Sequence, residues 1–158
     1  NEVERLNDLV GPLQRVGDTL CARAFQTAVG CVAVASVDRA TLRWNRNAGG
    51  IQAVGADADY LFGADGADRV SAWKAATGEL VWQNERFIYR GLSAPLSVGK
   101  TVIFGDAEGQ VHFLSREDGK TMLRLPTDGS PVAAQPVASG STMLVVTRNG
   151  GLFAFRPE

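Results

Sequence analysis

The sequence is poor in the residues that build most metal and nucleophilic centres. Its 158 residues include two cysteines, Cys21 and Cys31, and a single histidine, His112. Two cysteines are too few for a disulfide-rich scaffold or for a zinc site with four protein ligands. No serine, cysteine or acid is arranged around His112 as a catalytic triad requires, so we expect this side chain on the face of a strand. We therefore expect no catalytic, cofactor-binding or metal-binding residue in this chain.

Neither charge nor hydropathy indicates a nucleic-acid surface or a membrane span. The 16 basic and 17 acidic residues nearly cancel, whereas a nucleic-acid surface needs clustered lysine and arginine. No apolar run reaches the roughly 18 residues that a transmembrane helix needs. The opening residues NEVERLNDLV have neither the basic end nor the apolar centre of a signal peptide. We expect any export signal to have been removed or to lie upstream of this sequence.

What the sequence does contain is a repeat of 41 residues. Three columns of apolar or turn residues keep this interval: Leu20, Leu61, Val102 and Met143; Val29, Val70, Val111 and Leu152; and Gly17, Ala58, Gly99 and Gly140. Agreement at three independent columns indicates a repeated structural unit.

Each unit has the composition of a four-stranded antiparallel meander. Runs of β-forming residues such as TVIFGD and VHFL alternate with turns that contain Gly or Asp, such as DAEGQ and EDGK. Such alternation predicts antiparallel hairpins. Four strands in roughly 40 residues are typical of a propeller blade. We therefore predict an all-β fold, a β-propeller of four-stranded antiparallel blades.

The repeat divides the chain into a linker and four blades. We expect the linker over 1–11, blades over 12–47, 51–87 and 92–127, and a three-stranded terminal blade over 131–158. The first unit carries about three extra residues near CVAVASVDRA, which we interpret as a longer loop or a bulge before its last strand. A terminal blade without its fourth strand is typical of a ring closed by both chain ends. We therefore expect a fragment of a ring whose N-terminal part is absent from this sequence.

Tryptophans recur at the end of the units. Trp44 and Trp82 occupy equivalent positions in the first two units, and Leu123 takes this place in the third. A large flat ring fills the wedge between twisted sheets, so we predict that both tryptophans dock one blade onto the next. Trp73 belongs to a different, apolar column of the repeat, and we expect it to pack in the core.

Two other patterns resemble binding motifs. The carboxylates of ADADYLFGADGAD are a potential calcium site, but their spacing does not match a calcium-binding loop, and aspartates favour turns; they are Asp57, Asp59, Asp65 and Asp68. The triplet GKT in SVGKT lacks the first glycine of a phosphate loop, because Ala94 stands there, and a strand follows in place of a helix. We favour turn chemistry for the aspartates and exclude a phosphate loop.

The two cysteines lie at equal distances from the predicted hairpin turn around Gln26. This spacing places Cys21 and Cys31 nearly opposite each other on paired strands. Either they form a cross-strand disulfide in an oxidising compartment, or they are two small buried hydrophobic side chains. We favour the two buried thiols.

Several stretches resemble a known family. They are DRVSAWKAATGELVWQ (68–83), LSAPLSVGKTVIFGDAEGQVHFLSREDGK (92–120), VVTRNGGLFAF (145–155) and the opening EVERLNDL (2–9). Over essentially all 158 residues the chain resembles the C-terminal half of the BamB family, lipoproteins of the outer-membrane β-barrel assembly machinery in Gram-negative bacteria. Single blade motifs are shared among quinoprotein-like propellers, whereas ERLND and the GD-x-EG run are more discriminating.

The resemblance implies an eight-bladed, non-enzymatic propeller, held at the periplasmic face of the outer membrane by a lipid anchor. It also implies binding to the POTRA domains of BamA and help in delivering or folding barrel proteins. The family's acidic docking segment matches ERLNDLV, so we assign partner contacts to Arg5, Leu6 and Asp8. Val10 stands at the second acidic position of that segment, so the second charge is absent here.

Two other functions remain open beside the assembly scaffold. A quinone-dependent dehydrogenase of the same superfamily needs calcium ligands, a catalytic carboxylate and stacking groups at the ring centre, and no such set is present in the sequence. An unrelated adaptor propeller is the other alternative. The free strand edges of a propeller also suggest strand addition by extended clients, such as unfolded outer-membrane proteins.

Overall fold

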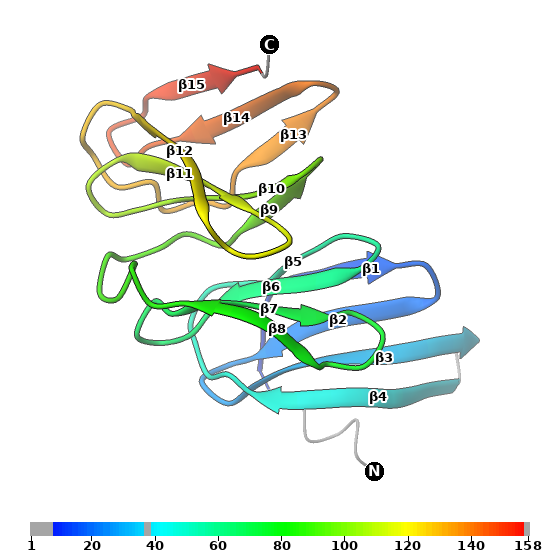
Figure 1. Cartoon of the computed structure of the whole chain (residues 1–158). Coiled ribbons are helices and arrows are strands. Elements are labelled where there is room, and N and C mark those ends of the chain that lie inside the picture. The colour runs from blue at the N-terminus through cyan, green and yellow to red at the C-terminus, as the bar shows by residue number, and fades with distance from the viewer. Residues whose placement is uncertain (1–7, 37–38, 157–158) are drawn as a thin grey trace.

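The structure, a computed structural model, describes residues 8–36 and 39–156 and contains fifteen strands in four sheets (Figure 1). Neighbouring strands in each sheet are antiparallel and consecutive in the sequence, so each sheet is a meander. The described residues form no helix, and therefore none that is long and apolar enough to cross a membrane. The prediction of an all-β propeller of antiparallel blades is confirmed.

The strands follow the units of the repeat. The first sheet contains β1 (Leu9–Val16), β2 (Thr19–Ala24), β3 (Ala28–Ser36) and β4 (Arg39–Asn47). The second contains β5 (Gly55–Ala56), β6 (Tyr60–Ala64), β7 (Val70–Lys74) and β8 (Leu80–Asn84). The third contains β9 (Leu96–Val98), β10 (Thr101–Gly105), β11 (Gln110–Ser115) and β12 (Thr121–Pro126). The fourth contains β13 (Val137–Ser139), β14 (Thr142–Val146) and β15 (Leu152–Phe155) in the described part.

Strand register reproduces the repeat. The second strand of each sheet meets the third at one equivalent pair: Leu20 with Val32, Leu61 with Trp73, Val102 with Leu114, and Met143 with Phe155. Successive pairs are 41 residues apart, so residues at the repeat interval occupy the same place in successive blades. The innermost strands also lie side by side, since β5 contacts both β1 and β9.

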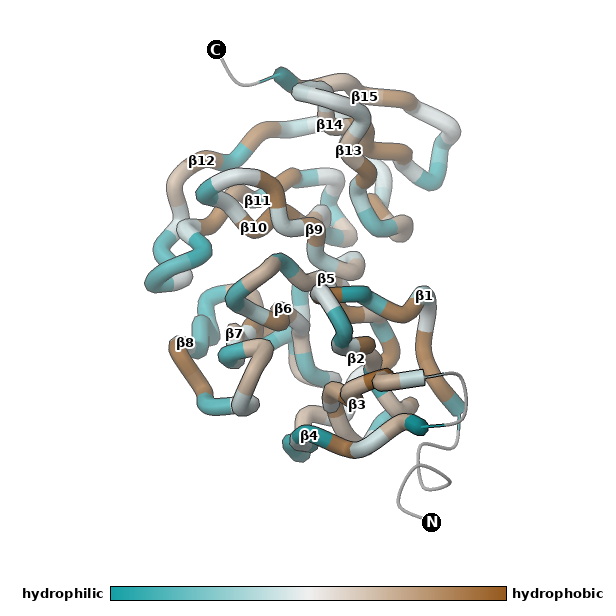
Figure 2. The backbone as a smooth tube through the Cα atoms, turned by 90° about the vertical axis from the view of Figure 1, so that its right-hand side faces the viewer, coloured by the Kyte–Doolittle hydropathy of each residue, from teal (hydrophilic) through white to brown (hydrophobic). Residues whose placement is uncertain are grey.

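In the second and third sheets the second strand is buried on both faces, because each of these sheets packs between two others. Successive side chains of a strand point to opposite faces. Leu61 of β6 therefore belongs to the buried cluster that contains Trp44 of the first sheet, whereas Phe62 belongs to the cluster that contains Val102 of the third. Apolar residues accordingly concentrate along the strands, and hydrophilic residues occupy many of the turns (Figure 2).

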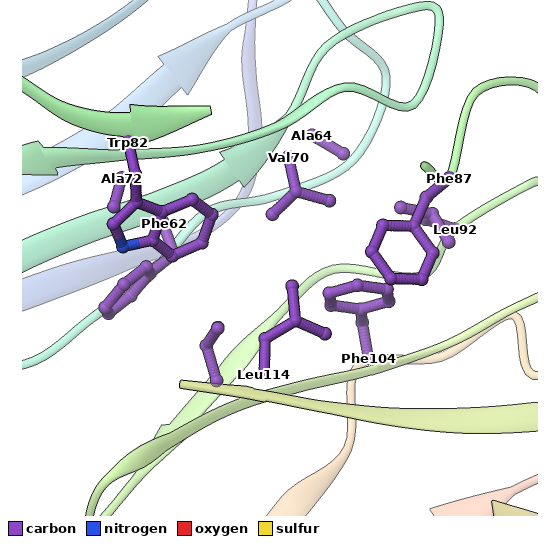
Figure 3. Close-up of a cluster of buried hydrophobic side chains, with 10 residues drawn as sticks. Phe62, Ala64, Val70, Ala72, Trp82, Phe87, Leu92, Phe104 and Leu114 are labelled. Carbon is purple, nitrogen blue, oxygen red and sulfur yellow. The ribbon is translucent and has the colours of Figure 1, made fainter. Parts of the chain in front are cut away.

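The largest apolar cluster lies between the second and third sheets (Figure 3). Phe62 and Trp82 come from one sheet and Phe104 and Leu114 from the other, and Phe87 closes the cluster from the connection between them. Phe62 and Phe104 are almost fully buried. Burying one such side chain contributes about 2–3 kcal/mol, so contacts between blades supply much of the stability of the fold.

The first sheet has an unusually long last hairpin. β3 and β4 have nine residues each, whereas β7 and β8 have five each. Bulges interrupt the pairing of β3 with β4. The extra residues near CVAVASVDRA therefore lengthen both strands and are accommodated by bulges. At the other edge of the sheet, strand pairing starts at Leu9, within the segment 1–11 expected as a linker.

Cys21 and Cys31 form a disulfide, so the favoured expectation of two buried thiols is wrong. The two residues face each other directly across β2 and β3 and are fully buried. The pairing of these two positions brings the sulfur atoms together. The spacing in the sequence alone is compatible with a disulfide and with two free thiols. The disulfide lies in the apolar layer between the first and second sheets.

Candidate partner-docking face

One end of the blades carries the long connections between sheets. Because the strands of a meander alternate in direction, the turn from second to third strand and the connection to the next sheet share this end. We call it the loop face. It comprises the turns around Gln26, Gly66, Ala107 and Arg148 and the connections 48–54, 85–95 and 127–136.

Backbone hydrogen bonds join the segments of the loop face at the repeat interval. The N–H groups of Phe25, Gly66, Ala107 and Arg148 donate to the carbonyls of Asp8, Gly49, Arg90 and Pro131, respectively, at 2.8–3.0 Å. Donors and acceptors alike are 41 residues apart. Only backbone atoms take part, so the acceptor position tolerates an acid, a glycine, an arginine or a proline. The backbone bonds therefore fix the position of each loop, while the side chains of the loops differ from one blade to the next.

Asp8 is the one predicted contact residue that the structure describes; Arg5 and Leu6 lie outside the described residues. The side chain of Asp8 is exposed, and its carbonyl accepts the N–H of Phe25 at 2.8 Å. Its φ of 58° is in the left-handed region, which aspartate tolerates better than most residues. Val10 is half-buried on β1, opposite Arg23, and contributes no charge to this face.

Two apolar side chains are exposed on the same part of the loop face. Phe25 is 44% exposed and directly bonded through its backbone to Asp8, and Ile51 is 61% exposed. Ile51 follows Gly50, whose carbonyl accepts the N–H of Gln26 at 3.1 Å. An acid beside exposed apolar groups on fixed loops has the composition of a small protein-binding surface.

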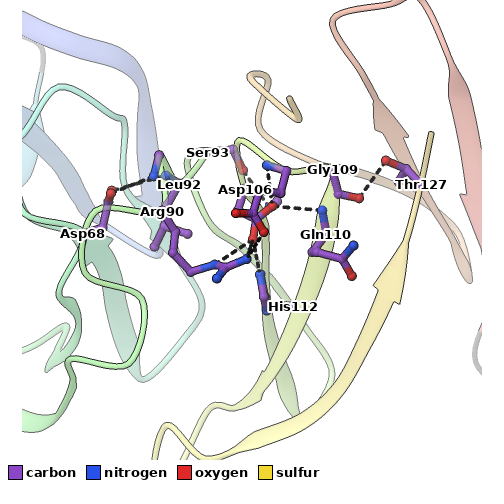
Figure 4. Close-up of polar contacts among 12 residues, drawn as sticks. Asp68, Arg90, Leu92, Ser93, Asp106, Gly109, Gln110, His112 and Thr127 are labelled. Carbon is purple, nitrogen blue, oxygen red and sulfur yellow. Dashed lines mark hydrogen bonds and ion pairs between the residues drawn. The ribbon is translucent and has the colours of Figure 1, made fainter. Parts of the chain in front are cut away.

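A buried acid that the sequence analysis did not assign connects the second and third blades (Figure 4). Asp106 is fully buried, and its Oδ2 lies 2.8 Å from His112 Nε2 and accepts a hydrogen bond from Arg90 Nε at 2.9 Å. Its Oδ1 accepts the backbone N–H groups of Glu108 and Gln110, both at 2.9 Å. His112 lies on strand β11, as expected, and the acid beside it was not assigned from the sequence.

Hydrogen bonding determines the protonation state of Asp106. Burial alone would raise the pKa of this carboxyl, but the bonds from His112, Gln110 N–H and Arg90 outweigh burial and hold the pKa well below its usual range. Asp106 is therefore an anion whose two oxygens are both occupied by protein donors. The sequence signal for it was the GD-x-EG run, whose aspartate closes a turn by accepting backbone N–H groups.

Arg23 is a second buried polar group that the sequence did not reveal. It is fully buried on β2, and its Nη1 donates to the carbonyl of Ala48 at 2.5 Å. Its Nε and Nη2 find no hydrogen-bond partner among residues 8–36 and 39–156. Desolvation lowers the pKa of Arg23 to about 10, although Asp65 opposes this shift. Gly63 makes room for the guanidinium, since a Cβ there would lie 2.6 Å from Nη2.

The four aspartates considered for calcium serve different turns and ion pairs. Arg116 pairs with Asp57 at 3.3 Å and with Asp59 at 2.5 Å, Arg69 pairs with Asp65 at 2.7 Å, and Asp68 accepts the N–H groups of Gly91 and Leu92. Among the residues that the structure describes, no three metal-ligating side chains form a group that could hold a metal ion.

Trp44 and Trp82 make equivalent contacts with the next blade. Trp44 Nε1 donates to the carbonyl of Ala75, and Trp82 Nε1 donates to the carbonyl of Arg116, both at 2.8 Å. Each ring lies against a turn glycine: a Cβ at Gly78 would lie 2.4 Å from the ring of Trp44, and one at Gly119 would lie 2.5 Å from the ring of Trp82.

Comparison with known proteins agrees with this architecture. The family model described as outer membrane protein assembly factor BamB matches residues 1–84. The outer membrane protein assembly factor BamB of Burkholderia pseudomallei is 40% identical over 157 residues, which cover 99% of this chain and 40% of that protein. The chain thus spans about two fifths of the length of this relative.

Solved structures show the same fold at lower identity. The crystal structure of BamB from Moraxella catarrhalis has a TM-score of 0.83 at 22% identity and covers 92% of this chain and 42% of that one. A europium-containing methanol dehydrogenase has a TM-score of 0.62 at 17% identity over 75% of this chain and 25% of its own. At these identities both likenesses show the propeller fold alone. Because the family model matches more than half of the residues, the chain belongs to the family of the outer membrane protein assembly factor BamB.

Proposed function

We propose that this chain is part of a non-enzymatic scaffold for outer-membrane protein assembly, and that its loop face binds the POTRA domains of BamA. The observation that carries the proposal is the position of Asp8. It stands exposed on a loop that backbone hydrogen bonds fix to the neighbouring turn, beside the exposed Phe25 and Ile51. Membership of a family named for outer-membrane assembly supports the role of a scaffold.

The geometry suggests how such a surface binds. The bonds between loops hold the surface in one shape, so little conformational entropy is lost when a partner binds. Phe25 and Ile51 supply apolar area for a partner to bury, while a carboxylate at Asp8 attracts a basic group and discriminates against an acidic one. We extend the contact to Arg5 and Leu6, which precede Asp8 in the sequence.

The rest of the proposed setting follows from the same family. The full protein forms an eight-bladed ring, with a lipid anchor at the periplasmic face of the outer membrane, and its free strand edges bind extended segments of unfolded outer-membrane proteins. Trp44 and Trp82 lock successive blades of that ring. The buried disulfide fits such a location, since disulfides persist in oxidising compartments such as the periplasm.

Calorimetric titration of the protein with the BamA POTRA domains tests the docking proposal. We expect Asp8→Arg to weaken binding at least about tenfold, because it replaces an attractive charge with a repulsive one. Asp18→Arg is the matched control: Asp18 is an exposed acid on the turn between β1 and β2, at the opposite end of the blade. Equal affinity of the Asp8→Arg variant and the wild type would contradict the assignment.

A further inference from the structure

A small cavity opens between the second and third blades. Its volume is about 200 Å³, and it is lined by Arg86, Phe87, Arg90, His112, Thr121 and Arg124. These residues come from the connection 85–95, from β11 and from β12. No acidic side chain is among them, and three of the six carry a guanidinium group.

The positive charge in this cavity is only partly balanced. Arg90 pairs with Asp106 at 2.8 Å and with Glu108 at 2.9 Å, so two carboxylates outside the cavity lining neutralise its charge. In the described part of the chain, neither Arg86 nor Arg124 forms an ion pair. The nearby acids of the adjoining groove have other partners, since Glu85 lies 4.0 Å from Arg69 and Asp118 lies 2.6 Å from Lys120.

The cavity is also built of rigid parts. His112 is fixed by its bond to Asp106 and by an edge-to-face contact with Phe87, whose ring centroid lies 4.9 Å away. Arg124 lies directly across the sheet from His112 in the pairing of β11 with β12. Arg86 follows Asn84, whose side-chain oxygen accepts the backbone N–H of Arg86 at 2.9 Å. Two uncompensated cations are thus brought to one wall by fixed backbone.

We propose that this cavity binds a single oxyanion group, a phosphate or a carboxylate. A guanidinium presents paired N–H donors that match the oxygens of either group. The hydroxyl of Thr121 offers a further donor at the same cavity, and its volume suits one such group. The site is separate from the surface around Asp8 and does not depend on the docking proposal.

Titration of the purified protein with inorganic phosphate and, separately, with acetate tests the site, with ionic strength held constant by chloride. The Nε–H signals of arginine in the NMR spectrum report which side chains respond. We expect at least one of the two anions to shift the signals of Arg86 and Arg124 saturably, and the anion that saturates identifies the class of ligand. Arg124→Gln and Arg86→Gln should each raise its Kd about tenfold or more.

Arg148→Gln is the matched control, because Arg148 is an exposed arginine on the fourth blade, away from the cavity. This variant should bind the anion as the wild type does. The proposal is overturned if neither anion saturates, if Arg124→Gln and Arg86→Gln bind as tightly as the wild type, or if Arg148→Gln weakens binding equally.

Discussion

Asp106 shows how one side chain couples two blades at the residue scale. It closes its own turn through two backbone N–H groups and reaches Arg90 of the preceding connection and His112 of β11. Because the four bonds fill both carboxylate oxygens, the third blade's turn, its strand and the connection from the second blade are held as one unit. The loop face is stiff at this point for the same reason.

Asp106→Asn removes the charge and keeps the size of the side chain. We expect the free energy of unfolding at pH 7 to fall by about 2 kcal/mol, since hydrogen bonds to a charged group contribute about 1.5–3 kcal/mol. The folded-state pKa of Asp106 is lower than the unfolded one, so its contribution is complete above the unfolded pKa of about 4. The contribution of Asp106 to stability is then lost as the pH falls from the unfolded-state pKa through the folded-state pKa.

Urea titrations of both proteins between pH 7 and pH 3 measure this difference. The gap in stability should be constant down to about pH 4 and narrow below it. A gap that stays constant throughout, or no gap at pH 7, would contradict the role assigned to Asp106.

Gly119→Ala tests the contact between Trp82 and the next blade. Gly119 has a φ of 68°, and a Cβ there would lie 2.5 Å from the ring of Trp82. The control is Gly99→Ala, since Gly99 has a φ of 57° and open space around it. Because alanine disfavours a positive φ, each substitution costs about 1–2 kcal/mol in backbone strain. We expect the free energy of unfolding of Gly119→Ala to fall by roughly 1–3 kcal/mol more than that of Gly99→Ala, because the added methyl group overpacks the contact. Equal losses in thermal or urea unfolding would show that the ring does not lie tightly against the turn.

At the scale of elements, the repeat predicted the sheets because strand pairing is local and periodic. Columns such as Leu61 and Val102 alternate with turn residues, and these columns occupy equivalent paired positions in successive sheets. The contact of Arg90 with Asp106 spans two blades and has no periodic counterpart, so no spacing rule indicated it. The hydrogen bonds between loops could not be predicted from the sequence either, because they join backbone atoms and do not require particular residue types.

The disulfide cross-links the β2–β3 hairpin at the centre of the first sheet. It links β2 and β3 across a separation of ten residues. Replacing both cysteines by alanine should lower the free energy of unfolding by about 2–3 kcal/mol, as the loss of a cross-link over a short loop predicts. Urea unfolding of the oxidised wild type and the double variant measures the loss. Treatment of the wild type with a reductant should lower its stability to a similar degree, and the double variant should not respond to it. Equal stability of all these forms would contradict a stabilising role.

At the scale of the whole molecule, the blades present two ends of different character. The end with Gly17, Gly99 and Gly140 consists of short turns at positive φ. The loop face carries the longer connections, the backbone hydrogen bonds between its own segments, and the exposed Phe25, Ile51 and Tyr89. A partner that binds several blades at once therefore finds apolar area and charge on the loop face.

Mapping of the proposed POTRA-binding surface by NMR tests this assignment most directly. Backbone amide signals of the isotopically labelled protein are compared with and without unlabelled POTRA domains. We expect the largest changes at Asp8, Phe25 and Ile51, with little change at Gly17 and Gly99 on the opposite end. Changes confined to the opposite end, with Asp8 and its neighbours unaffected, would contradict docking through the loop face.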